Sequence, residues 1–337
     1  MSRLREERIR TVTQERELLR ETVRGLVAKH AGPEAVREAM ASERGYDESL
    51  WKLLCEQVGA AALIVPEELG GAGGELADAA TVLSELARGL VPTPLLGTTL
   101  AELALLASDD VDADTLARLA DGTAIGAVVF ENDEPSQEEH QAADYVVNGD
   151  VADVVVAVGN DRITRWTTFT SQPVSTMDPT RRLGRLTPQS TAPLGTDPGI
   201  ADTAAILLAA EQVGAAERCL DLTVDYTRQR VQFGRPIGSF QALKHRMADL
   251  YVMLSAARAV VDDSLAEPSP TAAALARVTA TEAFCAVAGE AIQMHGGIAI
   301  TWEHDIQLYF KRAHASAQLL GPTRHHLRRL EREVLND

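Results

Sequence analysis

The chain has 337 residues, of which 45% are hydrophobic and only 4% aromatic. This length accommodates two or three domains, and alanine, leucine and valine must fill their core, which favours closely packed helices. The formal net charge of -17 argues against nucleic acid or an anionic membrane surface as a partner.

Residues 1 to about 120 are predicted to be mainly helical. Apolar residues recur at helical spacing among charged ones over 11–28, and further helices are expected over 49–58 and 76–90. The glycine-rich stretch 66–74 predicts a loop between the last two, and Val91-Pro-Thr-Pro94 predicts the end of the third.

The pattern changes near residue 124. Short runs rich in β-branched residues, broken by Gly, Asn and Asp, cover 124–130, 145–148, 151–158 and 163–169. They predict the strands of a small sheet or barrel. The chain from there to about residue 200 is expected to stay stranded or irregular.

Helical spacing returns at Ile200. Long helices are predicted from residue 200, over 243–261 and over 272–294, with a last one over 306–319. Their apolar residues alternate spacings of three and four, which is typical of helices buried along one seam of a bundle. Glu217, Asp221 and Asp225 predict a solvated acidic face on the first of these helices.

The predicted fold class is therefore α+β. We expect an N-terminal helical domain over 1–122, a shortened middle β-domain over 123–198 and a C-terminal four-helix bundle over 199–337. The cysteines Cys55, Cys219 and Cys285 form no C-x-x-C pair and no metal-ligand spacing. No apolar leader or membrane-length run is evident, so a cytoplasmic protein without a metal site is expected.

Two motifs carry the chemistry. The first is Arg230-Val-Gln-Phe-Gly-Arg-Pro-Ile-Gly-Ser-Phe-Gln241, and the second is Gln293-Met-His-Gly-Gly297. An arginine can fork onto phosphate oxygens, and paired glycines let backbone N–H groups approach a ligand closely. Each motif alone is equally consistent with a helix-capping turn, but the two in this order favour a ligand site.

Together with their helical surroundings, these motifs resemble the C-terminal half of the acyl-CoA dehydrogenases. Pro66-Glu-Glu-Leu-Gly-Gly71 and Asp178-Pro-Thr-Arg-Arg182 resemble the family's N-terminal domain and the end of its β-domain. The resemblance implies the acyl-CoA dehydrogenase fold and α,β-dehydrogenation of an acyl-CoA thioester. In that reaction a glutamate removes the α-proton while the β-hydrogen passes as hydride to the flavin of FAD.

The resemblance also implies how FAD is shared, because each FAD of the family lies between two subunits. Arg230, Phe233 and Gln241 would hold the pyrophosphate and adenine end of a neighbour's FAD. The segment with Gln293, Gly296 and Gly297 would contact the same FAD by close backbone approach. An electron-transfer flavoprotein would accept the electrons.

Two further stretches narrow the resemblance. Pro92-Thr-Pro94 and Thr301-Trp-Glu-His-Asp305 resemble the actinobacterial branch of the family, which acts on steroid side chains and other bulky CoA esters. The implied substrate class is accordingly a steroid side-chain CoA ester.

The catalytic carboxylate of the family is missing. Its usual position falls on Leu320, just before Gly321, and the alternative position falls on Ala204. Neither residue can accept a proton. The segments that would surround the flavin ring, 131–135 and 145–153, lack the family's pattern and are shortened.

Other carboxylates are weaker candidates for a base. Glu282 lies within the apolar stripe of the helix over 272–294, where burial would raise its pKa, although an interhelical ion pair is the more common role. Glu303 follows the Gly-Gly turn, in a cluster with His304 and Asp305 that is more typical of capping. Glu211 is expected to be solvated.

The leading prediction is a base-lacking subunit of a heteromeric, α2β2 acyl-CoA dehydrogenase. It would complete the FAD site of a homologous catalytic subunit that carries the base and binds the acyl-CoA. Two alternatives remain open. The first is a self-sufficient homo-oligomeric acyl-CoA dehydrogenase with a relocated base, and the second is a flavin-free structural or regulatory protein.

Overall fold

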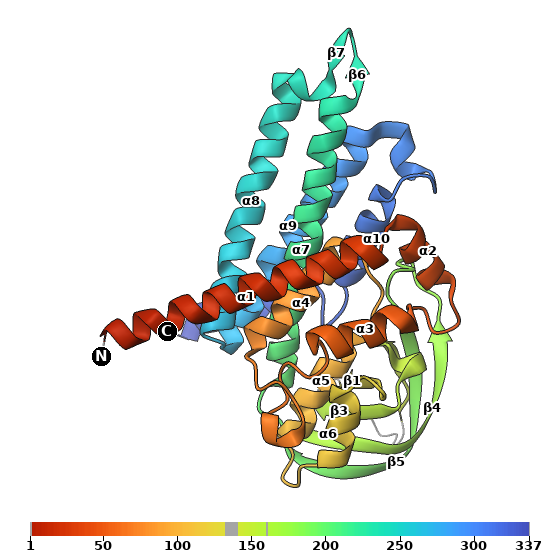
Figure 1. Ribbon diagram of the computed structural model, residues 1–337, viewed down its shortest axis with the longest axis vertical. Coiled ribbons are helices and arrows are strands. Elements are labelled where there is room, and N and C mark those ends of the chain that lie inside the picture. The colour runs from red at the N-terminus through yellow and green to blue at the C-terminus, as the bar shows by residue number, and fades with distance from the viewer. Residues whose placement is uncertain (1, 132–140, 160, 337) are drawn as a thin grey trace.

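The computed structural model describes residues 2–131, 141–159 and 161–336. Helices of the N-terminal part, a twisted sheet and a bundle of long helices follow one another along the chain (Figure 1). This order confirms the predicted α+β architecture. The boundaries at 122/123 and 198/199 stay predictions.

The N-terminal part consists of helices whose ends follow from local sequence. They are α1 (Ser2–His30), α2 (Pro33–Ala41), α3 (Glu48–Val58), α4 (Leu76–Arg88), α5 (Leu95–Leu106) and α6 (Ala113–Ala120), with the short 3₁₀ helix η1 (Glu67–Leu69). Helix α3 begins where the Asp47 carboxylate accepts the backbone N–H groups of Ser49 and Leu50. It ends at Gly59, whose φ of 67° suits glycine.

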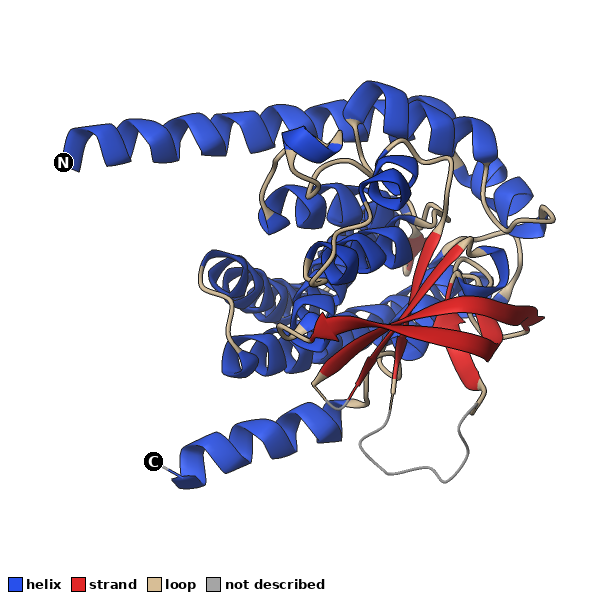
Figure 2. Ribbon diagram, turned by 90° about the horizontal axis from the view of Figure 1, so that it is seen from below, coloured by secondary structure: helices blue, strands red, loops and turns tan. Residues whose placement is uncertain are grey.

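The sheet has the strand order β1-β3-β4-β5-β2. Its strands are β1 (Gly126–Phe130), β2 (Ala143–Val147), β3 (Val154–Gly159), β4 (Arg162–Val174) and β5 (Leu183–Thr196), and only β1 and β3 pair in parallel. In Figure 2 the sheet lies along one side of the helical body. Helix α5 packs on β1 and β3, and the valines of both strands are buried on the two faces of the sheet.

The C-terminal bundle consists of α7 (Ile200–Gln229), α8 (Gln241–Ala266), α9 (Pro270–His295), α10 (Ile306–Ser316) and α11 (Thr323–Asn336). A small hairpin of β6 (Val231–Gln232) and β7 (Arg235–Pro236) joins α7 to α8 and stands at the free end of the bundle (Figure 1). Helix α11 was not predicted. Helix α9 has the length and composition of a membrane span, but it packs against α7, α8, α10 and α11.

Small residues let the helices approach closely. A Cβ at Gly214 of α7 would lie 2.3 Å from the carbonyl oxygen of Ser84 in α4, so only glycine fits at this crossing. Alanines fill the seams between α7 and α9. One apolar core therefore runs from the N-terminal helices into the bundle.

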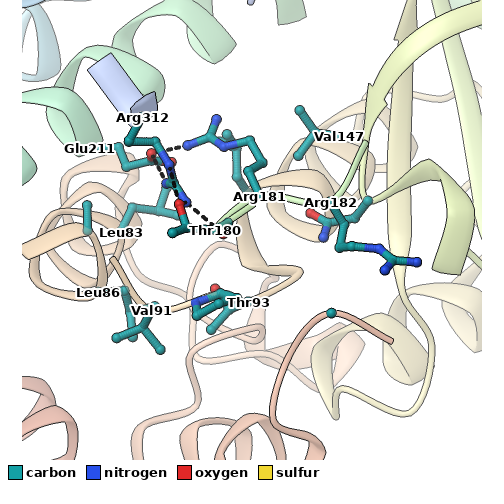
Figure 3. Close-up of a pocket in the computed structure, with 15 residues that line it drawn as sticks. Leu83, Leu86, Val91, Thr93, Val147, Thr180, Arg181, Arg182, Glu211 and Arg312 are labelled. Carbon is teal, nitrogen blue, oxygen red and sulfur yellow. Dashed lines mark hydrogen bonds and ion pairs between the residues drawn. The ribbon is translucent and has the colours of Figure 1, made fainter. Parts of the chain in front are cut away.

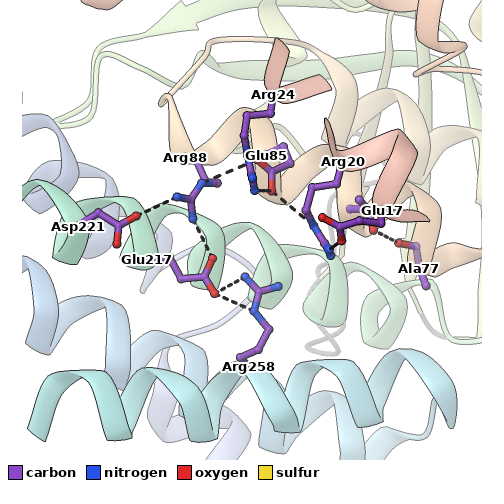
Figure 4. A network of polar contacts seen from close by, with 10 residues as sticks. Glu17, Arg20, Arg24, Ala77, Glu85, Arg88, Glu217, Asp221 and Arg258 are labelled. Atoms are coloured by element: carbon purple, nitrogen blue, oxygen red, sulfur yellow. Dashed lines mark hydrogen bonds and ion pairs between the residues drawn. The ribbon is translucent and has the colours of Figure 1, made fainter. Parts of the chain in front are cut away.

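A network of ion pairs joins α1, α4, α7 and α8 (Figure 4). Arg24 of α1 binds Glu85 of α4 at 2.9 Å, and Arg88 of α4 binds Glu217 of α7 at 2.9 Å. Arg258 of α8 binds the same Glu217 at 2.6 Å. The prediction of a solvated acidic face on α7 is therefore wrong for Glu217, which cross-links three helices.

Glu102 of α5 is a buried carboxyl group without compensation. It is 0% exposed, and neither of its carboxylate oxygens has a hydrogen-bond partner among the described residues. Burial raises its pKa well above the ordinary value of 4.5, so the folded chain favours the neutral acid.

We expect Glu102→Leu to raise the free energy of unfolding by about 1–3 kcal/mol at pH 7.5, because an uncompensated buried polar group is removed. A carboxyl whose pKa is raised on folding stabilises the fold below 4.5 and loses that contribution as the pH rises. The gain in the free energy of unfolding of Glu102→Leu, measured by urea unfolding, should therefore be smaller at pH 5 than at pH 7.5. The exposed Glu38→Leu serves as control, and an equal gain there would contradict burial as the cause.

Candidate cofactor and substrate site

The turn that holds Leu320 is fixed by two buried side chains. Leu320 has a φ of 56°, a strained value for a residue with a side chain, and Gly321 follows with 89°. Arg277 of α9 donates to the Leu319 carbonyl at 2.8 Å, and His326 of α11 lies 3.0 Å from the Leu320 carbonyl. The side chain of Leu320 packs on the main core.

The alternative base position is closed. Ala204 is 0% exposed in α7 and packs within the core. Arg277 is also buried there, and its guanidinium donates to the Gln212 amide oxygen at 2.6 Å. Burial lowers the pKa of Arg277 to about 10, so it remains a cation at neutral pH.

A small cavity lies where the N-terminal helices, the sheet and the bundle meet (Figure 3). Its lining includes Leu83 of α4, Val147 at the end of β2 with Asn148 after it, and Glu211 of α7. Val147 and Asn148 belong to the segment predicted to surround the flavin ring, and Glu211 follows Ala204 by about two helical turns. The cavity measures about 30 Å³, which holds about one water molecule.

A buried ion cluster consists of Asp178, Thr180, Arg181, Glu211 and Arg312. All of these except Asp178 line one side of the cavity (Figure 3). Arg312 of α10 binds Asp178 at 2.6 Å, Glu211 at 2.9 Å and the Thr180 carbonyl at 2.7 Å. Arg181 also binds Glu211. The prediction that Glu211 is solvated is wrong. Arg181, from the loop between β4 and β5, and Arg312, from α10, cover its carboxylate.

The charges of the buried ion cluster are balanced. Burial alone would lower the pKa of Arg312, but Asp178 and Glu211 outweigh that effect and the pKa is raised. Burial lowers the pKa of Arg181, which Glu211 opposes. With arginines on both sides, Glu211 is held as an ion-pair partner rather than as a base.

The other predicted carboxylates do not form a site. Glu282 is exposed on α9, which corrects the expectation of possible burial in the apolar stripe. Glu303 is exposed as well. Among the described residues neither makes an ion pair or hydrogen bond. Of the segments predicted around the flavin ring, residues 132–135 lie outside the described residues.

The residues of the two sequence motifs lie at the free end of the bundle. Arg230 ends α7, Gln241 begins α8, and Phe233, with 92% of its surface exposed, caps the hairpin between them. The φ of Phe233 is 54° and that of Gly234 is 76°, as the tight turn of this hairpin requires. Gln293, Gly296 and Gly297 are also exposed. We call these six residues the dinucleotide surface.

The last turn of α7, which precedes the first motif, contacts the end of α9, which carries the second. Arg230 N–H donates to the carbonyl of Tyr226 at 2.9 Å, and the Tyr226 ring stacks on His295, whose C-terminal neighbour is Gly296. A Cβ placed on Gly296 or Gly297 would meet nothing within 4 Å, so the space beside the turn is open. An exposed arginine, an amide and open backbone groups fit a phosphate-bearing ligand. The cavity beside Glu211 does not fit a flavin ring.

Sequence reasoning missed the buried ion cluster. Arg181 stands within the quoted stretch 178–182, where one acid followed by two arginines was a usable signal. No local pattern marks Arg312, because its partners are more than 100 residues away.

Helical, sheet and bundle parts in this order along the chain are the architecture of the FAD-binding dehydrogenases that act on acyl-CoA. Residues 13–123 match the model of the acyl-CoA dehydrogenase N-terminal domain, and residues 201–335 match that of the C-terminal domain. The chain therefore belongs to the acyl-CoA dehydrogenase family, an oxidoreductase family.

Relatives and solved structures agree with this assignment. The chain is 69% identical to the acyl-CoA dehydrogenase IpdE2 of Mycobacterium tuberculosis over 96% of its own length and 98% of the relative's. The steroid ACAD Tcur3481-Tcur3483 has a similar structure, with a TM-score of 0.85, 26% identity, and coverage of 96% of this chain and 99% of that one. The ChsE4-ChsE5 complex of M. tuberculosis is also similar, with a TM-score of 0.85 and 25% identity. The match covers 96% of this chain and 97% of that one.

Proposed function

We propose that this chain is the base-lacking subunit of a heteromeric acyl-CoA dehydrogenase and completes the FAD site of a base-bearing partner. The observation that carries this proposal is the contrast between the chain's two sites. Its dinucleotide surface is exposed and open, whereas both base positions hold apolar residues, Leu320 and Ala204. A chain of this kind can grip a neighbour's cofactor but cannot itself remove the α-proton.

The buried ion cluster supports the same assignment of roles, in which the partner binds the flavin ring and this chain does not. A drug-sized or cofactor-sized ligand needs a pocket of about 300–1,000 Å³. The cavity between Val147 and Glu211 has about 30 Å³. We infer that Glu211 and its arginines fill the position that the flavin ring would otherwise occupy in this chain.

The names of similar proteins point to the partner and the substrate. Two structurally similar proteins are named as pairs, Tcur3481-Tcur3483 and ChsE4-ChsE5, and the first is called a steroid ACAD. We therefore propose a homologous partner subunit and a steroid-derived acyl-CoA ester as substrate. An electron-transfer flavoprotein is the proposed acceptor, and the cytoplasm the proposed location.

The proposed role of the chain's own residues is to bind the cofactor. Arg230 would bind the pyrophosphate through its guanidinium, and Gln241 would donate to the same end of the cofactor. The Gly296-Gly297 turn would offer backbone N–H groups. When bound, FAD supplies the acceptor for the hydride.

The test compares the purified chain with the complex formed on co-expression with a base-bearing family member. We expect the chain alone to be colourless and inactive, because it has no base and no room for the flavin ring. The complex should be yellow, retain FAD through gel filtration, and oxidise an acyl-CoA ester with an artificial electron acceptor. A missing general base alone costs about 10²–10⁴-fold in rate.

Other results would favour the alternatives. Full activity of the lone chain with bound FAD would indicate a self-sufficient enzyme. A stable complex that stays colourless after addition of FAD would indicate a flavin-free structural role. Either result would refute the proposed function.

A further inference from the structure

A stack of aromatic rings joins the last turn of α7 to the end of α9, the two helices that lead into the two parts of the dinucleotide surface. Tyr226 of α7 stacks on His295 at the end of α9, with 4.2 Å between ring centroids and 23° between ring planes. The Tyr226 hydroxyl also donates to the His295 carbonyl at 3.3 Å. His304, from the following loop, meets His295 edge-on at 4.7 Å. The position of the Gly-Gly turn relative to α7 thus depends on His295.

Hydrogen bonds assign both imidazoles as neutral. Nδ1 of His295 lies 2.7 Å from the Ala291 carbonyl, which only accepts, so this nitrogen carries the proton. Nε2 of the same ring is buried and has no hydrogen-bond partner among the described residues. Nδ1 of His304 accepts the backbone N–H of Ile306 at 3.2 Å, so its proton is on Nε2. A second proton on His295 would therefore be buried without an acceptor, beside another imidazole.

No nearby carboxylate compensates for such a proton. Asp225 of α7 lies 3.8 Å from Arg228 of the same helix. In the loop, Asp305 binds Arg37 of α2 at 2.5 Å, and Glu303 is exposed. None of these carboxylates hydrogen bonds to either histidine among the described residues.

The environment also sets the sign of the pH effect. Burial lowers the pKa of His295 below its ordinary value of 6.5, and His304 adds to this effect. The neutral ring stabilises the stack fully above pH 6.5. Below it, a loosened state takes up a proton that the stacked state excludes, so the stack weakens as the pH falls.

We propose that His295 is a positioning residue that holds the Gly296-Gly297 turn against the end of α7 while neutral and releases it when protonated. The dinucleotide surface then holds a phosphate-bearing ligand at neutral pH and lets it go in mild acid. This inference rests on the proposed function, since it assigns FAD of the partner as the ligand.

The test uses the co-expressed complex and measures the FAD that survives gel filtration between pH 5 and 8, by visible absorbance. Retention by the unmodified complex should fall below about pH 6.5, by up to about tenfold per pH unit for one linked proton. His295→Phe keeps a flat ring for the stack and removes the proton site, so its retention should stay level. His295→Ala should lose FAD at every pH.

Controls separate this inference from the proposed function. His30→Phe, at an exposed position of α1, should follow the unmodified profile. If His295→Phe shows the same acid loss as the unmodified complex, the inference is refuted. The melting temperature of the chain alone, measured over the same pH range, gives a second readout. A smaller acid decrease for His295→Phe there supports the stack even if no complex binds FAD, in which case only the proposed function fails.

Discussion

Replacing Arg312 by leucine is expected to lower the free energy of unfolding by about 3–5 kcal/mol, because it strands buried carboxylates. Arg312 is 5% exposed and satisfies Asp178, Glu211 and the Thr180 carbonyl at once. Its removal leaves Asp178 without its cation and Glu211 with Arg181 alone. These residues come from the end of the β-domain, α7 and α10, so the loss should also reduce cooperativity between the sheet and the bundle.

Urea unfolding followed by far-UV circular dichroism measures this effect. Arg312→Lys should recover only part of the loss, since an ammonium cannot match the fork of a guanidinium. Arg258→Ala is the matched control, because it breaks an ion pair with Glu217 in a half-exposed setting. There we expect about 0–1 kcal/mol. Comparable losses for Arg312→Leu and Arg258→Ala would show that the buried ion cluster contributes no more to the free energy of unfolding than a half-exposed ion pair does.

The second large effect concerns ligand binding rather than stability. In the complex with a base-bearing partner, Arg230→Ala should weaken FAD binding by about 10- to 100-fold, the equivalent of one or two charge-assisted hydrogen bonds. Arg230 is exposed, so the stability of the chain itself should hardly change. Rebinding of FAD to the deflavinated complex, followed by flavin fluorescence, gives the affinity.

A neighbouring arginine provides the control for this experiment. Arg228 is also exposed in the last turn of α7, and Arg228→Ala removes the same charge without touching the motif. Arg230→Lys should fall between the unmodified complex and Arg230→Ala, because it keeps the charge and loses the fork. Equal effects of Arg228→Ala and Arg230→Ala would mean that general charge, not a specific contact, attracts the cofactor.

Sequence periodicity predicted most of the fold. The helix expected over 49–58 is α3 (Glu48–Val58), and that expected over 272–294 is α9 (Pro270–His295). Both succeed because caps and apolar spacing are local properties. Helix α11 was missed, since its sequence is rich in charge and its apolar face is narrow.

The residues of the candidate site were likewise predicted where the signal is local in sequence and misjudged where it is not. The motif residues could be recognised because each motif is continuous in sequence. Glu211 was misjudged because its burial depends on Arg181 and Arg312, which reach it from other elements. Glu282 was misjudged for the opposite reason, as an apolar stripe in sequence includes a residue that the bundle leaves at its surface.

The small cavity beside Glu211 limits what a single substitution could restore. Under the proposed function, changing Leu320 to glutamate would not by itself create an independent enzyme, because the cavity of about 30 Å³ beside Glu211 would still not hold a flavin ring. Removing any one charge of the buried ion cluster alone would destabilise the fold. Under the proposed function, the dependence on a partner therefore rests on several residues at once, and no single substitution would remove it.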